Sequence, residues 1–294
     1  MLDIIRSPKV DHARDLQFRL NRLNNLRFNP ALPTTQWREQ LAEVAKLSVV
    51  EGKFLEASRL AVAERAAEAP TETVEFIKWF ERLKENGPGQ NDFLFSWLSE
   101  ECSMEQMKWF LTQEVAGEAG FEDLTALTQL KLPTRPKLEL ARNYWDEMGR
   151  GNPKAMHGPL LAALAQHLEL EPLAETTVTE ALALANTMAG LAANRRYAYH
   201  SVGALGAIEM TAPARSAATS AGLKRLGVKA GNRHYFALHA ILDVKHSLAW
   251  NSEAIEPLVS EIPGASVAIA EGALMRLECG ARCFERYRHQ LGLP

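Results

Sequence analysis

The sequence predicts an all-α protein, and three observations lead to that expectation. Every long segment after residue 34 repeats its apolar residues with the period of an α-helix. No segment shows a convincing alternation of apolar and polar residues, which would mark a half-buried strand. Proline, glycine and asparagine gather between the periodic segments, where they favour turns. At 294 residues the chain is long enough for one large domain, or for a core domain with an extension.

The first 33 residues are expected to be irregular, because three prolines interrupt them. A long helix should begin after Thr34–Thr35, whose hydroxyls can cap it, and end at Pro70. Gly52 lies inside this segment and either divides the helix or is tolerated within it. The segment therefore predicts one or two helices ahead of the core.

The clearest boundary in the chain is the turn-forming cluster Asn86-Gly87-Pro88-Gly89. It ends the amphipathic helix VEFIKWFERLK and has the composition of a loop. We therefore expect an N-terminal helical extension over residues 1–89 and a core domain over residues 90–294.

About seven helices are expected in the core domain, packed as a bundle. Ser103 should open one of them in a capping box with Gln106. Asn152–Pro153 should restart the chain as a helix after a glycine-rich break, since proline suits a first helical turn. Pro213 is expected to end the helix over residues 195–210, because an interior proline removes a hydrogen bond and clashes with the preceding turn.

Composition indicates a globular protein and argues against several function classes. Hydrophobic residues make up 47% and charged residues 23% of the chain, so disorder is not expected. The formal net charge of −3 argues against a nucleic-acid partner, which would need a basic surface. No signal peptide and no apolar run of about 20 residues is evident, so no membrane partner is expected. Three cysteines do not make a disulfide framework, and a cytoplasmic location is expected.

The segment Tyr235–Trp250 holds the most informative spacing in the chain. His239, Asp243 and His246 are separated by four and then three residues, which places them within an arc of about 60° on one helix. The apolar residues between them leave no broad polar face, which argues against the alternative of a solvated stripe. Three side chains that can bind a metal would therefore share one side of a helix.

A two-metal site inside a helix bundle needs about six or seven ligands from several facing helices. Glu209 is the best further candidate, because it follows a run of small and apolar residues where an unpaired carboxylate is costly. The alternative is an exposed position near a helix end. Glu114 is an acid on an otherwise apolar helix face, and Glu118, one turn later, could replace it. Simple exposure to solvent is the alternative for this pair.

The segment DEMGRGNPKAMH contains the last two candidate metal ligands. Glu147 precedes a Gly-x-Gly break, and His157 follows Glu147 by ten positions. Glycines permit a kink and a close approach of the backbone, so side chains on either side of the break can face one centre. Taken alone, a histidine such as His157 is more often a packed or surface residue than a ligand.

Taken in chain order, these residues resemble the ligand pattern of the heme-oxygenase-like diiron oxidase/oxygenase family, also called iron-containing redox enzymes. That pattern has a Glu on the first core helix and a Glu-x-Gly-x-Gly segment followed by His. A Glu then ends an Ala/Gly-rich helix, and a final helix carries His-x-x-x-Asp-x-x-His. The resemblance covers about residues 90–290, and its most specific parts are the final motif and the GRG segment. The matching positions are Glu114, Glu147, His157, Glu209, His239, Asp243 and His246.

The resemblance implies a heme-oxygenase-like bundle that holds two iron ions and uses O₂ to oxidise a small substrate. A ligand set that includes Glu147 is most similar to that of the N-oxygenating members. N-oxygenation of an amine- or amino-acid-derived metabolite in a natural-product pathway is therefore expected. The alternative for the same site is oxidative C–C cleavage or desaturation of a small acid. The resemblance also suggests a homodimer, since some relatives dimerise through an N-terminal extension, and an external electron donor or reductase.

Two relatives of similar shape fit the sequence less well. Heme oxygenases proper hold heme through one histidine near the start of the fold, and before Glu114 only His12 is present in the extension. Thiaminase-type members rely on a catalytic cysteine, and Cys102 has no evident histidine or acid partner in the sequence.

Tyr144 and Arg215 are the candidate substrate-binding residues. Tyr144 lies three residues before Glu147, and Arg215 can bind a carboxylate through two parallel hydrogen bonds, with a surface arginine as the alternative. His200 is expected to be structural, because it lies on the other side of its helix from Glu209. Two further function classes stay open: a non-catalytic helical protein, and the same fold with another metal or an organic ligand.

Overall fold

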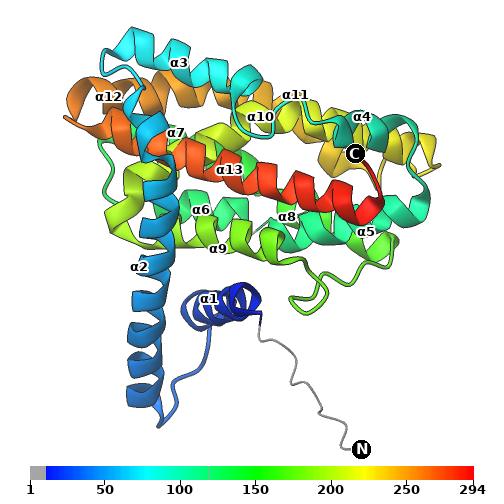
Figure 1. Cartoon of the computed structure of the whole chain (residues 1–294), viewed down its shortest axis with the longest axis horizontal. Helices are drawn as coiled ribbons and strands as arrows, with labels where there is room; N and C mark the ends of the chain where they lie inside the picture. The colour runs from blue at the N-terminus through cyan, green and yellow to red at the C-terminus, as the bar shows by residue number, and fades with distance from the viewer. Residues whose placement is uncertain (1–10, 119) are drawn as a thin grey trace, which may run out of the picture.

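The chain folds into a bundle of helices around two long central ones (Figure 1). The structure is a computed structural model that describes residues 11–118 and 120–294, and within those ranges it contains no strand. The prediction of an all-α fold is confirmed. The helices are α1 (His12–Phe28), α2 (Trp37–Ala67), α3 (Thr73–Asn86), α4 (Phe93–Glu100), α5 (Met104–Gly117), α6 (Phe121–Thr128), α7 (Thr134–Glu147), α8 (His157–His167), α9 (Thr179–Ala193), α10 (Ala198–Arg225), α11 (His234–Ala249), α12 (Glu256–Glu261) and α13 (Ala265–Leu291), with 3₁₀ turns at Gly149–Gly151 and Arg195–Tyr197 and a π-helical segment at Trp250–Ile255.

Helices α10 and α13 cross in the centre of the bundle with their backbones in contact. A Cβ added to Gly203 of α10 would lie 1.9 Å from the carbonyl oxygen of Ile269, and one added to Gly272 of α13 would lie 1.9 Å from that of His200. Only glycine permits such an approach. Helices α4, α9 and α11 pack around this pair, so α10 has neighbours on several sides. The glycines thus fix the spacing of the helix that carries Glu209.

The N-terminal segment is more helical than the sequence suggested. Residues 12–28 form α1, so the prediction of an irregular start is wrong there, and residues 1–10 lie outside the described residues. Asp11 caps α1 by accepting hydrogen bonds from backbone N–H groups of its first turn. Helix α2 runs unbroken through Gly52 and packs against α13 and α9. Leu20 and Leu23 of α1 and Leu55 and Val62 of α2 are buried, which stabilises these helices despite the prolines nearby, whereas the start of α2 is largely exposed.

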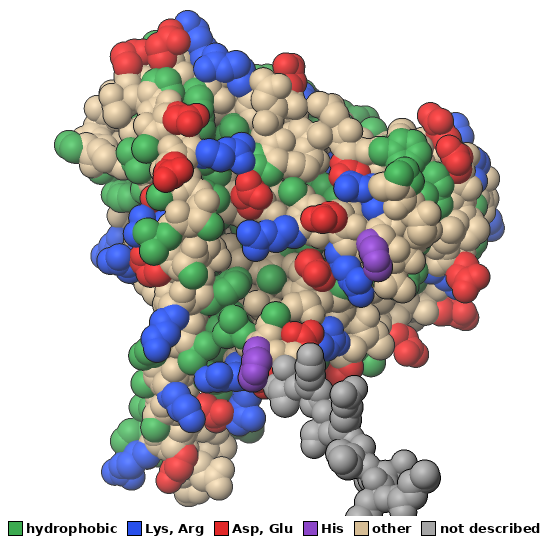
Figure 2. Space-filling model, in the orientation of Figure 1, with side chains coloured by type: hydrophobic (Ala, Val, Ile, Leu, Met, Phe, Trp, Pro, Cys, Tyr) green, Lys and Arg blue, Asp and Glu red, His purple; other side chains and the backbone are tan. Residues whose placement is uncertain are grey.

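Helix α3 packs against α12 and α10, so the N-terminal helices lie on the core instead of apart from it (Figure 1). The division between residues 1–89 and 90–294 stays a prediction. Figure 2 shows acidic and basic side chains interspersed on the face in view, where α2 projects from the body. Of the helices in the described ranges, none is both long and apolar enough to cross a membrane.

Helix α10 contradicts the prediction that the helix ends at Pro213. The helix continues to Arg225 with Pro213 buried in its interior. Proline cannot donate a hydrogen bond to the carbonyl of Glu209, four residues earlier. Packing of α10 against α13, α11 and α4 offsets that loss. As a consequence Arg215 lies on the same helix as Glu209, and the separate helix expected after Pro213 does not exist.

The rest of the core follows the sequence with shifted boundaries. The capping box of Ser103 and Gln106 is present at the start of α5. The helix expected from Asn152–Pro153 begins instead at His157. The core contains more than the expected seven or so helices, because short helices such as α4, α6 and α12 divide it.

Candidate metal centre

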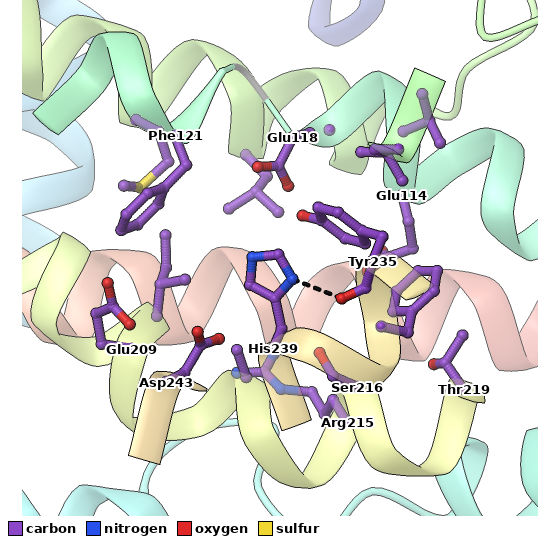
Figure 3. Close-up of a pocket in the computed structure, with 18 of the residues that line it drawn as sticks. Glu114, Glu118, Phe121, Glu209, Arg215, Ser216, Thr219, Tyr235, His239 and Asp243 are labelled. Carbon is purple, nitrogen blue, oxygen red and sulfur yellow. Dashed lines mark hydrogen bonds between the residues drawn. The ribbon is translucent and has the colours of Figure 1, made fainter. Parts of the chain in front are cut away.

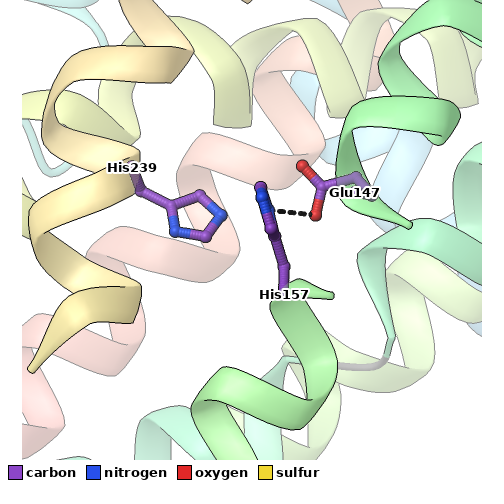
Figure 4. A group of neighbouring side chains, drawn as sticks. All are labelled: Glu147, His157 and His239. Carbon is purple, nitrogen blue, oxygen red and sulfur yellow. Dashed lines mark ion pairs between the residues drawn. The ribbon is translucent and has the colours of Figure 1, made fainter. Parts of the chain in front are cut away.

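Helices α7, α8, α10 and α11 bring six of the predicted ligands together in two neighbouring groups. Within each group, one donor atom from each residue lies within 4.8 Å of the others. Helix α11 contributes to both groups, because its three polar positions share one face as their spacing predicted. The first group is Glu147, His157 and His239 (Figure 4), and the second is Glu209, Asp243 and His246.

A sharp turn of the backbone between α7 and α8 builds the first group. Gly149 has φ +61°, and an added Cβ would lie 2.5 Å from the carbonyl carbon of Ala155. Glycine is therefore required for the chain to return so closely. The return places His157, the first residue of α8, beside Glu147 at the end of α7, with Nδ1 and Oε2 2.6 Å apart. The ring of His239 contacts that of His157, their centroids 4.6 Å apart.

Hydrogen bonds from outside the two groups orient both histidines of α11. The Nδ1–H of His239 donates to the carbonyl oxygen of Tyr235 at 2.7 Å, which leaves Nε2 free to bind a metal. His246 places Nε2 3.1 Å from Asp146 Oδ2, so its Nδ1 faces Glu209 Oε2 at 3.5 Å. A carboxylate behind a histidine is the usual support of a metal ligand in proteins.

Burial disfavours the charged forms of most of these side chains. It raises the pKa of Glu147 well above its ordinary value. Burial, followed by the charge of Glu209, raises the pKa of Asp243 to about 10. Burial also lowers the pKa of His157 and of His239 to about 4. Asp243 is therefore protonated and His157 and His239 are neutral near pH 7 when no cation is near.

His246 behaves differently from the other two histidines. Burial alone would lower its pKa, but contact with Glu209 and Asp146 outweighs burial and raises the pKa to about 9. The imidazolium thus supplies positive charge between carboxylates of α7 and α10. A metal ion in the second group would take over that role, since it carries more charge and sits among the same oxygens.

The unpaired donor atoms in these groups fit a pair of metal ions. Among the described residues, Asp243 Oδ1 is buried and forms no hydrogen bond, whereas the buried atoms His157 Nδ1 and His246 Nδ1 each face a carboxylate oxygen, at 2.6 and 3.5 Å, without hydrogen-bond geometry. A buried polar atom without a partner destabilises the fold by about 1–3 kcal/mol. One divalent cation in each group would bind these nitrogen and oxygen atoms, and mixed carboxylate and imidazole donors suit iron.

Binding of Fe(II) is expected to strengthen with pH, because it must displace protons from Asp243 and His246. The pKa of His246 in the folded protein, about 9, exceeds its ordinary value near 6.5. The stabilisation of the metal-free fold by protonated His246 is therefore complete below about pH 6.5 and is lost as the pH rises toward 9. The raised pKa of Asp243 acts in the same direction. Anaerobic thermal denaturation of the metal-free and Fe(II)-loaded forms should show a Tm difference that widens from about pH 6.5 to 8.5. A difference that stays constant or narrows would contradict this reasoning.

Glu114, the predicted first ligand, lies outside both groups. Figure 3 shows Glu118, which caps the C-terminal end of α5 one turn later, pointing toward the ring of His239, whereas Glu114 lies beyond Tyr235. After burial, the charges that raise the pKa of Asp243 include that of Glu118 but not that of Glu114. Of the two acids on α5, Glu118 is thus the one that faces the donor groups.

The structure also separates the two candidate substrate-binding residues. Arg215 lines the cavity beside the donor groups, which rules out the alternative of a surface arginine, whereas Tyr144 is not among the lining residues. His200 bonds through Nε2 to Glu271 Oε2 at 2.8 Å, which agrees with a structural role.

Two residues of α7 that support the second group were missed in the sequence. Asp146 contacts His246, and Asn143 donates from Nδ2 to Glu209 Oε1 at 2.5 Å. Asn143 lies one helical turn before Glu147, on the same side of α7, and that spacing was a usable signal. Asp146 precedes Glu147 directly, and nothing in the local sequence sets it apart from a surface acid.

A cavity of about 130 Å³ adjoins both donor groups. Glu147, His239, Glu209 and Asp243 are among its lining residues, so a small molecule inside it would contact metals held there. A cavity of about 150 Å³ can hold benzene, which sets the size of ligand that fits. Its apolar wall consists of Phe95, Val115, Phe121, Leu161, Leu184, Met188, Ile208, Ala212 and Phe236.

The chain is similar to a known protein family over the region that contains this centre. A family model described as iron-containing redox enzyme matches residues 108–281, which is more than half of the chain. The matched range contains all six residues of the two donor groups and both acids of α5. No curated protein matches the chain.

Proposed function

The chain belongs to the iron-containing redox enzyme family, and from that premise we propose that it is a non-heme diiron oxidase or oxygenase that uses O₂ on a small metabolite. Its all-α, heme-oxygenase-like bundle agrees with the family, and the protein is accordingly an oxidoreductase. The observation that carries the proposal is the pair of neighbouring donor groups beside one cavity, each mixing carboxylate and imidazole.

Each donor group would hold one iron ion. The first iron would take Glu147, His157 and His239, and the second Glu209, Asp243 and His246. When bound, the two ferrous ions supply the electrons that reduce O₂. Three donors from each group, with Glu118 as one further ligand, would leave room for O₂ or a substrate at the metals, as reactions at a metal require.

The other residues of the site orient the donors and exclude water. Asp146 and the carbonyl of Tyr235 hold the two histidines of α11 with one nitrogen facing the groups. Asn143 holds one oxygen of Glu209, which leaves the other for metal. The apolar wall of the cavity keeps water away from the reacting atoms, which limits side reactions.

N-oxygenation of an amine- or amino-acid-derived metabolite is the reaction that we propose. Two points support it: Glu147 lies in the first donor group, as its place in the ligand pattern of the N-oxygenating members requires, and the cavity has the size of a small metabolite. We further propose that the protein acts as a homodimer with an external electron donor, as the family resemblance suggests.

Stopped-flow mixing of Fe(II)-loaded protein with O₂ tests the proposal. We expect a transient visible absorption band after mixing. In a panel of amino acids, amines and small acids without nitrogen, an amine should hasten its decay and be recovered with an added oxygen on nitrogen. Recovery of a cleaved or desaturated acid would instead support C–C cleavage or desaturation. An Fe(II)-loaded protein that does not react with O₂ in any mixture would refute the proposal.

Glu118 is expected to be the iron ligand from α5, in place of Glu114. Glu118→Gln should weaken the binding of at least one iron by more than about ten-fold, because removal of even a supporting group costs 10- to 100-fold in metal affinity. Glu114→Gln is the matched control and should retain two irons per chain. Anaerobic Fe(II) titration of both variants distinguishes them, and loss of iron from Glu114→Gln alone would restore the original assignment.

A further inference from the structure

The cavity that adjoins the donor groups is also lined by two arginines. Arg215 of α10 and Arg276 of α13 both line it. Figure 3 shows Glu114 and Thr219 on the side of the cavity away from the second donor group. Ser216 lines the cavity too, and the charges of both arginines act on Glu114, which places them near this end. The cavity therefore joins a candidate metal centre to a basic end.

Arg215 is held in place by its own helix. Its Nε donates to the carbonyl oxygen of Thr211 at 3.1 Å, and its Nη2 donates to the hydroxyl of the same residue. The guanidinium lies over the ring of Phe284, 5.4 Å from its centroid. Because Arg215 follows Glu209 by six residues, it lies about 9 Å farther along the axis of α10. These contacts fix the guanidinium but leave some of its N–H groups without a partner.

Arg276 also has N–H donors that form no hydrogen bond with the described residues. Its Nε and Nη1 are buried and form no hydrogen bond with any described residue. A buried guanidinium without partners is costly, so such a group is expected where a ligand completes it. Its charge also acts on Arg215, whose pKa is lowered to about 9 by burial first and by Arg276 second. Two cations thus share one end of the cavity.

The acidic side chains at this end of the cavity do not neutralise the charge of both arginines. Burial raises the pKa of Glu114, while the charges of Arg215 and Arg276 act against that rise. Glu118, one turn away, points toward His239 and the donor groups and not toward this end of the cavity (Figure 3). Glu114 could offset at most one of the two guanidinium groups, so at least one positive charge is left without a partner.

We propose that Arg215 and Arg276 bind the carboxylate of the substrate, and that the substrate is a small carboxylic acid. Planar guanidinium groups with free N–H donors match a carboxylate, and the surplus charge matches one such group. With the acid at the arginines, the remainder of a molecule of this size reaches toward the donor groups. The inference rests on the proposed function for the reaction that follows, but carboxylate binding itself needs no iron.

Calorimetric titration with pentanoate and with pentanamide tests the inference, because the two probes differ mainly in charge. Fe(II)-loaded protein under argon and metal-free protein should both bind pentanoate at least ten-fold more tightly than pentanamide, since hydrogen bonds between charged groups are the stronger ones. Equal binding of the two probes, or no binding of pentanoate to either form, would overturn the inference.

Two variants that should change pentanoate affinity in opposite directions test whether Arg276 binds the carboxylate. Arg276→Gln should weaken pentanoate binding at least ten-fold and leave pentanamide binding unchanged. Glu114→Gln removes the acid that competes for the arginines and should tighten pentanoate binding. Arg282→Gln, at an exposed position of the same helix as Arg276, is the matched control and should change neither affinity. Pentanoate affinity unchanged in both Arg276→Gln and Glu114→Gln would overturn the assignment.

The carboxylate site and the diiron centre can each be refuted without the other. If the protein takes up no iron but still prefers pentanoate to pentanamide through Arg276, the diiron proposal fails and the carboxylate site stands. If the protein binds two irons and reacts with O₂ but does not distinguish the probes, the carboxylate site fails and the diiron proposal stands. Iron content of Arg276→Gln should equal that of the unmodified protein in either case.

Discussion

Replacing His246 with alanine is expected to lower the iron content from two ions per chain to one and to decrease O₂ consumption by at least about 100-fold. Loss of a supporting group near a metal costs 10- to 100-fold in affinity, and loss of a ligand costs more. His246 is the imidazole donor of the second group, so the remaining Glu209 and Asp243 cannot complete that site. Iron analysis after anaerobic loading, followed by measurement with an oxygen electrode, gives both numbers.

His234→Ala is the matched control for this experiment. His234 begins the same helix but is exposed and belongs to neither donor group, so its replacement should change neither iron content nor O₂ consumption. The Tm of both metal-free variants should be measured first to confirm that they fold. Unchanged iron content and O₂ consumption in His246→Ala would refute the ligand assignment.

Gly203→Ala is expected to destabilise the protein by about 3 kcal/mol or more, at or beyond the upper end for an overpacked core. The added Cβ would lie 1.9 Å from the carbonyl oxygen of Ile269, and backbone cannot give way as a flexible side chain can. Helices α10 and α13 would have to separate, which would also displace Glu209. For a chain of this size we expect the Tm to fall by at least about 6–12 °C, at roughly 2–4 °C per kcal/mol.

Gly52→Ala should act in the opposite direction and is the control for Gly203→Ala. An added Cβ at Gly52 would meet nothing within 4 Å, and the residue lies within α2. Alanine there favours the helix and should stabilise the protein by about 0.5–1 kcal/mol. Scanning calorimetry of both variants checks the pair. A Gly203→Ala protein as stable as the unmodified one would mean that α10 and α13 do not touch as described.

The parts of the centre that depend on helical spacing could be predicted from the sequence. His239, Asp243 and His246 lie on one face of α11 because four- and three-residue steps return to the same side of any helix. The Gly-x-Gly break marked the sharp turn that brings Glu147 and His157 together. These relations are local, so no knowledge of the packing was needed.

The parts that depend on packing could not be predicted in this way. Glu114 and Glu118 lie on the same side of α5, and only the position of α5 along the cavity decides which of them approaches α11. Continuation of α10 through Pro213 likewise follows from the neighbours of that helix, which local sequence does not contain. Arg276 resembles any other arginine on an amphipathic helix until α13 is placed against α10.

The most direct test of the central claim is anaerobic titration of the metal-free protein with Fe(II), followed by Mössbauer spectroscopy of the loaded form with ⁵⁷Fe before and after exposure to O₂. The two donor groups predict a binding endpoint of two irons per chain, high-spin ferrous signals before O₂, and a magnetically coupled diferric pair afterwards. An endpoint of zero or one iron, or two irons that stay uncoupled after oxidation, would contradict a diiron centre in this protein.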